Sequence, residues 1–456
     1  MTLPKKVSLP KMLKIEMNPV RVLAMGFALV ILLGGLLLML PISSQTGTVT
    51  PFIDSLFIST SAVCVTGLVT VDTGTHWTYF GKTVIISLIQ IGGLGFMTFA
   101  TLTAVFMGKK LGLKERLLMQ EAYNAMNLQG IIKMVRYVVG FTFGVELAGA
   151  LILMTQFIPM VGWAEGIYYG IFHSISAFCN AGFDLMGNFA SLTGVNTNKI
   201  ILTTIMTLIA VSGLGFSVWM EIWNFKSITR LSLHAKLVLS TTLFLIFGGA
   251  LLFFVFEYSN PATIGSMSFL DKVTNSMFAS ITPRTAGFNA ISIPDMSMAS
   301  RLLTIILMFI GGSPGSTAGG IKTTAISILF LTVLCVLKGR HDPEAFGRRI
   351  DKDSVFKAFA VVVIGLGIVF GVTLVMSFFE SAQGTSMEAL IFEATSAFAT
   401  VGLSEGITPD VQFTSKAALI AGMYFGRVGP ITVLLALSRQ KTPAQIAYPE
   451  GKILIG

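Results

Sequence analysis

The sequence has few charged residues and few cysteines. Only 12% of its 456 residues are charged and 53% are hydrophobic, whereas a typical soluble domain carries about 25% charged residues. Its three cysteines include no CxxC pair, so they predict neither a disulfide framework nor a zinc site. No cluster of His, Asp and Glu, no nucleophile elbow and no phosphate-binding loop supports an enzyme. A secreted enzyme, a disordered protein and a nucleic-acid binder are all disfavoured, despite a net charge of +9.

Long hydrophobic blocks make up most of the sequence. Eight blocks are long enough to cross a bilayer as helices, which takes about 20 apolar residues each. They lie near 22–42, 80–107, 135–158, 198–224, 235–257, 302–337, 355–379 and 415–438. Four shorter stretches lie between the members of each pair, near 52–65, 166–180, 269–285 and 386–400. Because these are too short to cross, we expect them to be re-entrant. The first block, after a basic N-terminus, is interpreted as a transmembrane helix and not as a cleaved signal.

The charged residues divide between two sets of loops. Most of the lysines and arginines lie in the N-terminal segment, in 109–136, 226–236 and 338–357, and after 439. The positive-inside rule makes these segments cytoplasmic. The other loops carry the acids Asp54, Asp72, Asp184, Asp271, Asp295, Glu405 and Asp410. The pattern predicts a multi-pass plasma-membrane protein in a lipid bilayer, with both termini cytoplasmic and an external acidic rim that attracts cations.

An internal repeat runs through the chain. Segments 54–67, 169–182, 274–287 and 389–402 align on their final glycines, which are 115, 105 and 115 residues apart. The second blocks also align, over 91–95, 211–215, 310–314 and 425–429, although small residues there would also serve close helix packing. The third segment departs from the others by having one residue fewer after its phenylalanine. We predict tandem repeats over 22–110, 133–226, 233–338 and 354–438, flanked by cytoplasmic segments 1–21 and 439–456.

The repeat predicts an all-α polytopic membrane protein. Each unit would be a span, a short pore helix, a glycine turn and a span, giving eight transmembrane helices and four re-entrant loops around a central pseudo-four-fold pore. Non-helical backbone is tolerated at membrane depth where it lines a water-filled cavity. A ring of carbonyls there can replace the hydration shell of a cation, and potassium holds its shell weakly.

The expected filter contains four residues from each unit. They are Cys64, Val65, Thr66 and Gly67; Cys179, Asn180, Ala181 and Gly182; Arg284, Thr285, Ala286 and Gly287; and Ala399, Thr400, Val401 and Gly402. Cys64 and Cys179 occupy equivalent positions, and either back the filter as small residues or form a redox pair. A single glycine turn would be an ordinary loop, but four turns in register favour a filter.

The sixth block cannot be one helix. Its 36 residues would extend about 54 Å as a continuous helix, against a hydrocarbon core of about 30 Å. Its middle is rich in helix-breaking residues: Gly311, Gly312, Ser313, Pro314, Gly315, Ser316, Thr317, Ala318, Gly319 and Gly320. We expect two helices joined by an intramembrane loop on the cytoplasmic side of the filter. The loop would act as a gate, or alternatively as a passive kink.

Two cations and one acid lie at predicted membrane depth. Arg427 occupies a position that is glycine in the other three units and would be an electrostatic barrier in the pore, a partner of Glu146 in an ion pair, or both. Lys322 follows the glycine-rich loop, and either adds to the barrier or extends toward the cytoplasm. Glu146 is a candidate proton-coupling site.

These motifs resemble the Trk/Ktr/HKT superfamily of cation transporters over about residues 20–440, and most closely its KtrB-type potassium-translocating subunits. The resemblance rests on the four filter glycines, on Gly311–Gly320 and on Arg427. It implies K+ as the transported ion, because a serine at the first filter glycine accompanies sodium permeation in the superfamily and this chain has Gly67. It further implies a gate at the glycine-rich loop, a homodimer, and control by a cytosolic nucleotide-binding regulatory ring (KtrA-like), with contacts expected at Lys338–Lys357 and after Arg439.

The sequence is compatible with two functions. The first is channel-like potassium uptake, with Na+ as a further permeant or activating ion. The second is a secondary transporter in which sodium or protons drive potassium, which should need titratable acids along the path. A scaffold that moves nothing is disfavoured by the four-fold filter motif.

Overall fold

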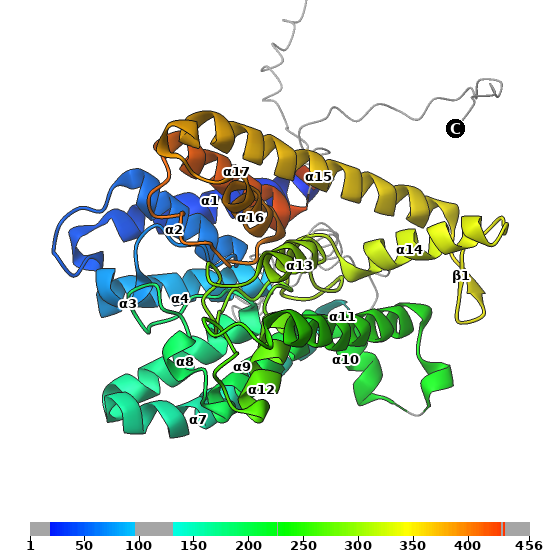
Figure 1. Cartoon of the computed structure of the whole chain (residues 1–456), viewed down its shortest axis with the longest axis horizontal. Helices are drawn as coiled ribbons and strands as arrows, with labels where there is room; N and C mark the ends of the chain where they lie inside the picture. The colour runs from blue at the N-terminus through cyan, green and yellow to red at the C-terminus, as the bar shows by residue number, and fades with distance from the viewer. Residues whose placement is uncertain (1–18, 96–130, 226, 430–431, 434–456) are drawn as a thin grey trace, which may run out of the picture.

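The apolar sequence folds into helices arranged around a buried centre in a computed structural model that describes residues 19–95, 131–225, 227–429 and 432–433 (Figure 1). A long and a short helix begin each of four consecutive units. These pairs are α1 (Pro19–Met39) and α2 (Phe52–Cys64), α7 (Ile131–Val161) and α8 (Trp163–Cys179), α11 (Leu233–Glu257) and α12 (Phe269–Ile281), and α15 (Lys352–Glu380) and α16 (Met387–Ala399). The four short stretches predicted between the blocks are therefore helices.

A further helix follows each short helix. These are α4 (Tyr79–Leu94), α9 (Lys199–Gly213) with α10 (Phe216–Trp223), α13 (Met298–Phe309) with α14 (Thr323–Leu337), and α17 (Phe413–Val428). Short 3-10 turns cover Pro41–Ser43, Thr193–Val195, Ile228–Arg230 and Ser381–Gln383, and helix α3 covers Thr73–His76. Serine, threonine or asparagine caps begin many of these helices. For example, the Asn198 side chain accepts from the Ile200 and Ile201 N–H groups, satisfying donors that a helix start leaves free.

Four helices in the described part of the chain are long and apolar enough to cross a membrane. They are the first helices of the units, and the bent pair α9–α10 would make a fifth. Helices α4 and α17 are shorter, at 16 residues each, and residues 96–107 and most of 430–438 lie outside the described residues. The N-terminal segment before residue 19 and the tail 439–456 lie outside them as well.

The block at 198–224 is not one continuous helix, and the sequence did not predict a break there. Helices α9 and α10 meet at 96°. The break falls at Gly215, which has φ +90, a conformation open to glycine and costly for other residues. The sixth block is broken as predicted, between α13 and α14. The aligned glycines Gly95 and Gly429, with φ +82 and +95, end α4 and α17 at the same register.

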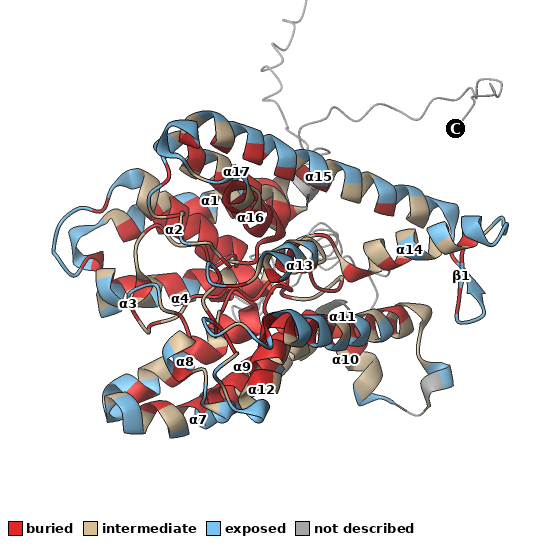
Figure 2. Cartoon of the chain, viewed as in Figure 1, coloured by how far each residue is buried: buried red, intermediate tan, exposed pale blue. Residues whose placement is uncertain are grey.

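The short helices are mostly buried, while the long helices form the exterior (Figure 2). Helix α15 is typical, because only 28% of its most apolar window is buried, and Phe370 and Phe378 on it are exposed. Apolar surface on this scale is unfavourable in water and favourable against lipid. Helices α14 and α15 extend together away from the centre, and a hairpin of β1 (Glu344–Ala345) and β2 (Arg348–Arg349) lies at their far end (Figure 1).

Candidate ion pathway

The four predicted filter glycines meet at the centre of the molecule. A Cβ on Gly67 would lie 2.5 Å from the carbonyl oxygen of Ala181, and one on Gly182 would lie 2.7 Å from that of Ala286. A Cβ on Gly287 would meet the carbonyl oxygen of Val401, and one on Gly402 that of Thr66. Each glycine thus lies against the carbonyl that precedes the next unit's glycine, and the fourth contact returns to the first unit. A larger residue would fit this closed ring only if a neighbouring carbonyl moved.

The backbone of each turn has the same shape. The residue two positions before each glycine is left-handed, with φ +57 at Val65, +60 at Asn180, +70 at Thr285 and +52 at Thr400. Three of these four are β-branched, and such residues are genuine outliers at positive φ. Strain of this kind costs about 1–3 kcal/mol for each residue and collects at functional sites.

The turns direct their N–H groups back to the short helices. The N–H of Thr66 donates to the Ser61 carbonyl at 2.7 Å, that of Ala181 to Ser176 at 2.8 Å, and that of Val401 to Ser396 at 2.9 Å. These bonds satisfy helix C-terminal carbonyls in the manner of a Schellman cap. They consume the donors of the turn, so its own carbonyls are free to act as acceptors.

Serine side chains fix the turns from behind. The Ser61 hydroxyl accepts from the N–H of Gly67 at 3.0 Å, and Ser396 accepts from Gly402 at 3.1 Å, while Ser176 donates to the Phe183 carbonyl at 2.7 Å. The third unit lacks serine at this position and uses Thr282, whose hydroxyl donates to the Phe288 carbonyl. The serine recurs in three of the four aligned segments, but nothing in the sequence indicates this role.

A cavity of about 380 Å³ opens on one side of the ring and is lined by all four glycines. The expected acids Asp72 and Asp184 also line it. Desolvation raises the pKa of Asp184 to about 7, and the nearby Asp72 acts in the same direction. The Asp72 carboxylate also accepts from the N–H of Phe189 at 3.0 Å, joining the first and second units.

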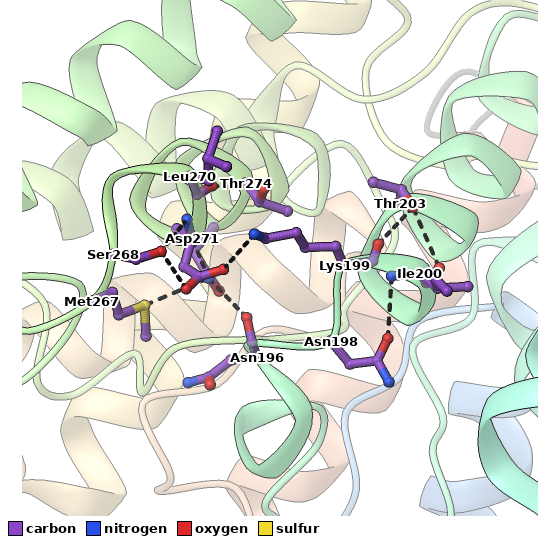
Figure 3. A network of polar contacts seen from close by, with 11 residues as sticks. Asn196, Asn198, Lys199, Ile200, Thr203, Met267, Ser268, Leu270, Asp271 and Thr274 are labelled. Atoms are coloured by element: carbon purple, nitrogen blue, oxygen red, sulfur yellow. Dashed lines mark hydrogen bonds and ion pairs between the residues drawn. The ribbon is translucent and has the colours of Figure 1, made fainter.

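Other expected rim acids have structural partners. Asp271 pairs with Lys199 across 3.4 Å and accepts from the Ser268 hydroxyl at 2.6 Å, joining α12 to α9 (Figure 3). The Ser268 hydroxyl, followed by Lys199, lowers the pKa of Asp271. Asp54 pairs with Lys416 at 2.8 Å. The rim is therefore partly neutralised, and the acids on the cavity are the ones placed to face an ion.

The glycine-rich loop lies against the other side of the ring. The Thr317 hydroxyl donates to the Phe178 carbonyl at 3.2 Å, just before the second turn. A Cβ on Gly319 would meet the Thr400 side chain of the fourth turn. The loop also enters the α9–α10 bend, where the Phe216 N–H donates to the Gly315 carbonyl at 2.9 Å. It therefore contacts two opposite units.

Arg427 joins three parts of the structure through carbonyl oxygens. Its guanidinium donates to Thr317 in the loop and to Gly92 and Gly93, the latter at 3.2 Å, at the C-terminal end of α4. A cation there also complements the helix dipole. The suggested ion pair with Glu146 is not formed. Glu146 instead accepts from the Gln90 amide at 3.1 Å, and the Lys322 ammonium donates to the Ala318 carbonyl at 2.6 Å.

The two equivalent cysteines are buried and free, so they do not form the disulfide that a redox pair would make. The Cys179 thiol lies 3.7 Å from Gln90 and 3.8 Å from Glu146. These contacts place Cys179 behind the second turn.

An apolar helical exterior around a buried ring of carbonyls is the build of a helical membrane transport protein. The sequence matches the family model described as TrkH, cation transport protein, over residues 16–445. The chain therefore belongs to the TrkH family of cation transport proteins, and the resemblance to the Trk/Ktr/HKT superfamily is confirmed.

Two bacterial relatives are each 42% identical to the chain. One is the potassium/sodium uptake protein NtpJ of Enterococcus hirae, matched over 98% of this chain and 99% of the relative. The other is the Ktr system potassium uptake protein B of Bacillus subtilis, matched over 97% and 98%. The crystal structure of the potassium transporter TrkH from Vibrio parahaemolyticus superposes with a TM-score of 0.72 at 18% identity, covering 94% of this chain and 87% of that one. It has the same fold.

Proposed function

We propose that this chain is the ion-translocating subunit of a potassium uptake system of the plasma membrane. The observation that carries the proposal is the closed ring in which each unit's filter glycine lies against the next unit's carbonyl. The names of the relatives agree with it, since both include potassium uptake. In this proposal the chain forms four span, pore-helix and span repeats with eight transmembrane helices around one pore.

The ring would select the ion through its carbonyl oxygens. Helices α2, α8 and α16 each end three residues before the filter glycine of their unit. The negative C-terminal ends of their dipoles therefore favour a cation at the centre. Carbonyls of the turns would replace water around K+, which costs less to dehydrate than Na+. The cavity acids Asp72 and Asp184 would raise the local cation concentration.

The loop 311–320 would be the gate, with Lys322 and Arg427 holding it below the filter. The position of the loop supports this role, because the loop contacts the second and fourth turns and is tethered by Arg427. A passive kink would need none of these contacts with opposite units.

Deleting Ser313–Thr317 should raise potassium flux and remove its regulation, because the deletion removes both the Phe178 contact and the Arg427 acceptor. The measurement is potassium efflux from liposomes containing the purified protein, with and without the regulatory partner. A deletion variant that keeps wild-type flux and wild-type regulation would exclude the gate.

The assembly would be a homodimer on a cytosolic nucleotide-binding ring, with both termini cytoplasmic. The name of the Bacillus relative places it in a Ktr system, which fits a subunit with partners. The β1–β2 hairpin carries the exposed Arg348 and Arg349 at the tip of α14 and α15, and is our proposed contact with the ring.

A second candidate function is coupled transport driven by sodium or protons. Two observations favour it: the Enterococcus relative is named for both potassium and sodium, and Glu146 is a buried carboxyl directly behind Cys179. Coupling would require Glu146 to exchange protons or contact sodium during transport.

The deciding experiment is cation flux through the purified protein in liposomes, with potassium and sodium compared at equal gradients. We expect potassium flux to exceed sodium flux and to proceed without a sodium or proton gradient. Equal flux of both ions would refute the filter. Flux that stops without a sodium or proton gradient would establish coupling instead.

A further inference from the structure

In two opposite units, a polar side chain at the same position of the short helix holds the segment that follows the filter glycine. We call this segment the exit of the filter turn. Counting nine residues back from the glycine gives His173 in the second unit and Glu393 in the fourth. Both side chains are fully buried. The equivalent residues of the first and third units are Ile58 and, because the third segment has one residue fewer after its phenylalanine, Ala279; both are apolar and buried.

His173 and Glu393 make the same contact. The N–H of Leu185, three residues after Gly182, donates to His173 Nε2 at 3.3 Å. The N–H of Glu405, three residues after Gly402, donates to Glu393 Oε1 at 3.1 Å. Two chemically different side chains therefore satisfy the same backbone donor in two of the repeats.

Each contact is fixed by further hydrogen bonds. His173 Nδ1 donates to the Tyr169 carbonyl at 2.8 Å, which leaves Nε2 as the acceptor, and the Tyr169 hydroxyl donates to the Leu185 carbonyl at 2.8 Å. Glu393 also accepts from the hydroxyls of Ser404 and Thr408, the latter at 2.8 Å. Buried polar groups with this many partners are rigid, since losing any partner leaves an unsatisfied group.

The other two units fix their exits in another way. After Gly287, the N–H of Asn289 donates to the Ser191 hydroxyl at 3.2 Å, and the Asn289 carbonyl accepts from Leu192 at 3.0 Å. After Gly67, Asp72 accepts from the N–H of Phe189. Both exits therefore attach to the loop of the second unit between Asp184 and Thr193. That loop in turn depends on His173, which holds its first residues.

We propose that His173 and Glu393 are a matched pair of positioning residues that set the width of the cation filter. The units that carry them lie across the ring from one another, because the glycine contacts run in the order first, second, third, fourth. With both exits held, the carbonyls at Gly182 and Gly402 keep a separation suited to a large cation. Without them the ring closes further and accepts a smaller cation. The inference rests on the proposed potassium filter and names residues that control it.

The test places leucine at this register in the first, second and fourth units and measures ion preference by binding. The full-length protein in detergent is heated in increasing KCl or NaCl, with choline chloride keeping the ionic strength constant. A bound ion stabilises the folded protein by RT ln(1 + [ion]/Kd), so the rise of the unfolding temperature with concentration gives a dissociation constant for each ion and hence a sodium-to-potassium ratio of these constants. This readout does not depend on whether the gate is open.

His173→Leu and Glu393→Leu should each lower that ratio roughly tenfold, which is the effect of one lost buried hydrogen bond. The matched control Ile58→Leu should change it less than about twofold, because no hydrogen bond is lost. His173→Gln and Glu393→Gln keep an acceptor and should retain most of the wild-type ratio. Leucine variants with the wild-type ratio, or glutamine variants as impaired as the leucine variants, would overturn the proposal.

A second variant covers the case in which leucine prevents folding. Ser404→Ala combined with Thr408→Val removes two donors to Glu393 without altering the short helix, and should lower the ratio in the same direction. Ser377→Ala, at an exposed hydroxyl on α15, is its control, and an unchanged ratio in the double variant would overturn the proposal. If the wild-type protein itself shows no preference for potassium, the proposed function fails; if it does and the variants keep it, only this inference fails.

Discussion

Gly67→Ser is expected to remove the preference for potassium over sodium. The added Cβ would lie 2.5 Å from the Ala181 carbonyl oxygen, at a backbone φ of +97. A residue other than glycine in a left-handed conformation costs about 1–3 kcal/mol, and the contact with Ala181 adds to that cost. Relief requires the second turn to move, which displaces a carbonyl of the ring. We expect the potassium-to-sodium flux ratio in liposomes to fall about tenfold or more, since about 1.4 kcal/mol corresponds to a factor of ten.

The control is Gly162→Ser. Gly162 has a similar φ of +90, but a Cβ there would meet nothing within 4 Å. The Gly162→Ser variant therefore has the backbone strain of Gly67→Ser without the contact with a neighbouring carbonyl. If both variants keep the wild-type flux ratio, Gly67 is not part of the filter.

Arg427→Ala is expected to raise potassium flux about tenfold in the absence of the regulatory partner. The substitution removes donors to Thr317 in the loop and to Gly92 and Gly93 in α4. A hydrogen bond from a charged group is worth about 1.5–3 kcal/mol, so the loop loses a large part of its attachment. The measurement is potassium efflux from liposomes, normalised to the amount of folded protein.

Arg427→Lys separates a tether from an electrostatic barrier. Lysine keeps the positive charge but presents a compact ammonium in place of a planar guanidinium, so it cannot bridge the loop and α4 as arginine does. If charge alone blocks the pore, flux in the lysine variant stays low; if the bridge matters, flux rises as in Arg427→Ala. Arg340→Ala, in an exposed pair with Glu344, is the control. If Arg427→Ala and Arg427→Lys both keep wild-type flux, Arg427 is neither a tether nor an electrostatic barrier.

The general layout was predictable because its signals are local. Four glycines at regular spacing predicted four equivalent turns, and each of them has positive φ. The density of glycine and proline after Ile310 predicted the break between α13 and α14. Both rest on backbone preferences that residue type determines directly.

Contacts made through the backbone were not predictable. Arg427 bonds to carbonyl oxygens, and every residue has a carbonyl, so no residue type marks the partner. An acid was the natural guess, and Glu146 proved to be bound to Gln90. The bend at Gly215 was missed for a related reason. A Gly-x-Gly sequence is compatible with a continuous apolar helix, and the bend depends on the loop that inserts its Pro314 and Gly315 carbonyls there.

The order of contacts in the glycine ring gives it a direction. Each unit leaves room for the carbonyl of the unit that follows it, and the fourth leaves room for the first. A side chain added in one unit should therefore disturb its successor before its predecessor. The four repeats are unable to drift apart independently in evolution, because a change in any one glycine must be accommodated by the backbone of the next repeat around the circle.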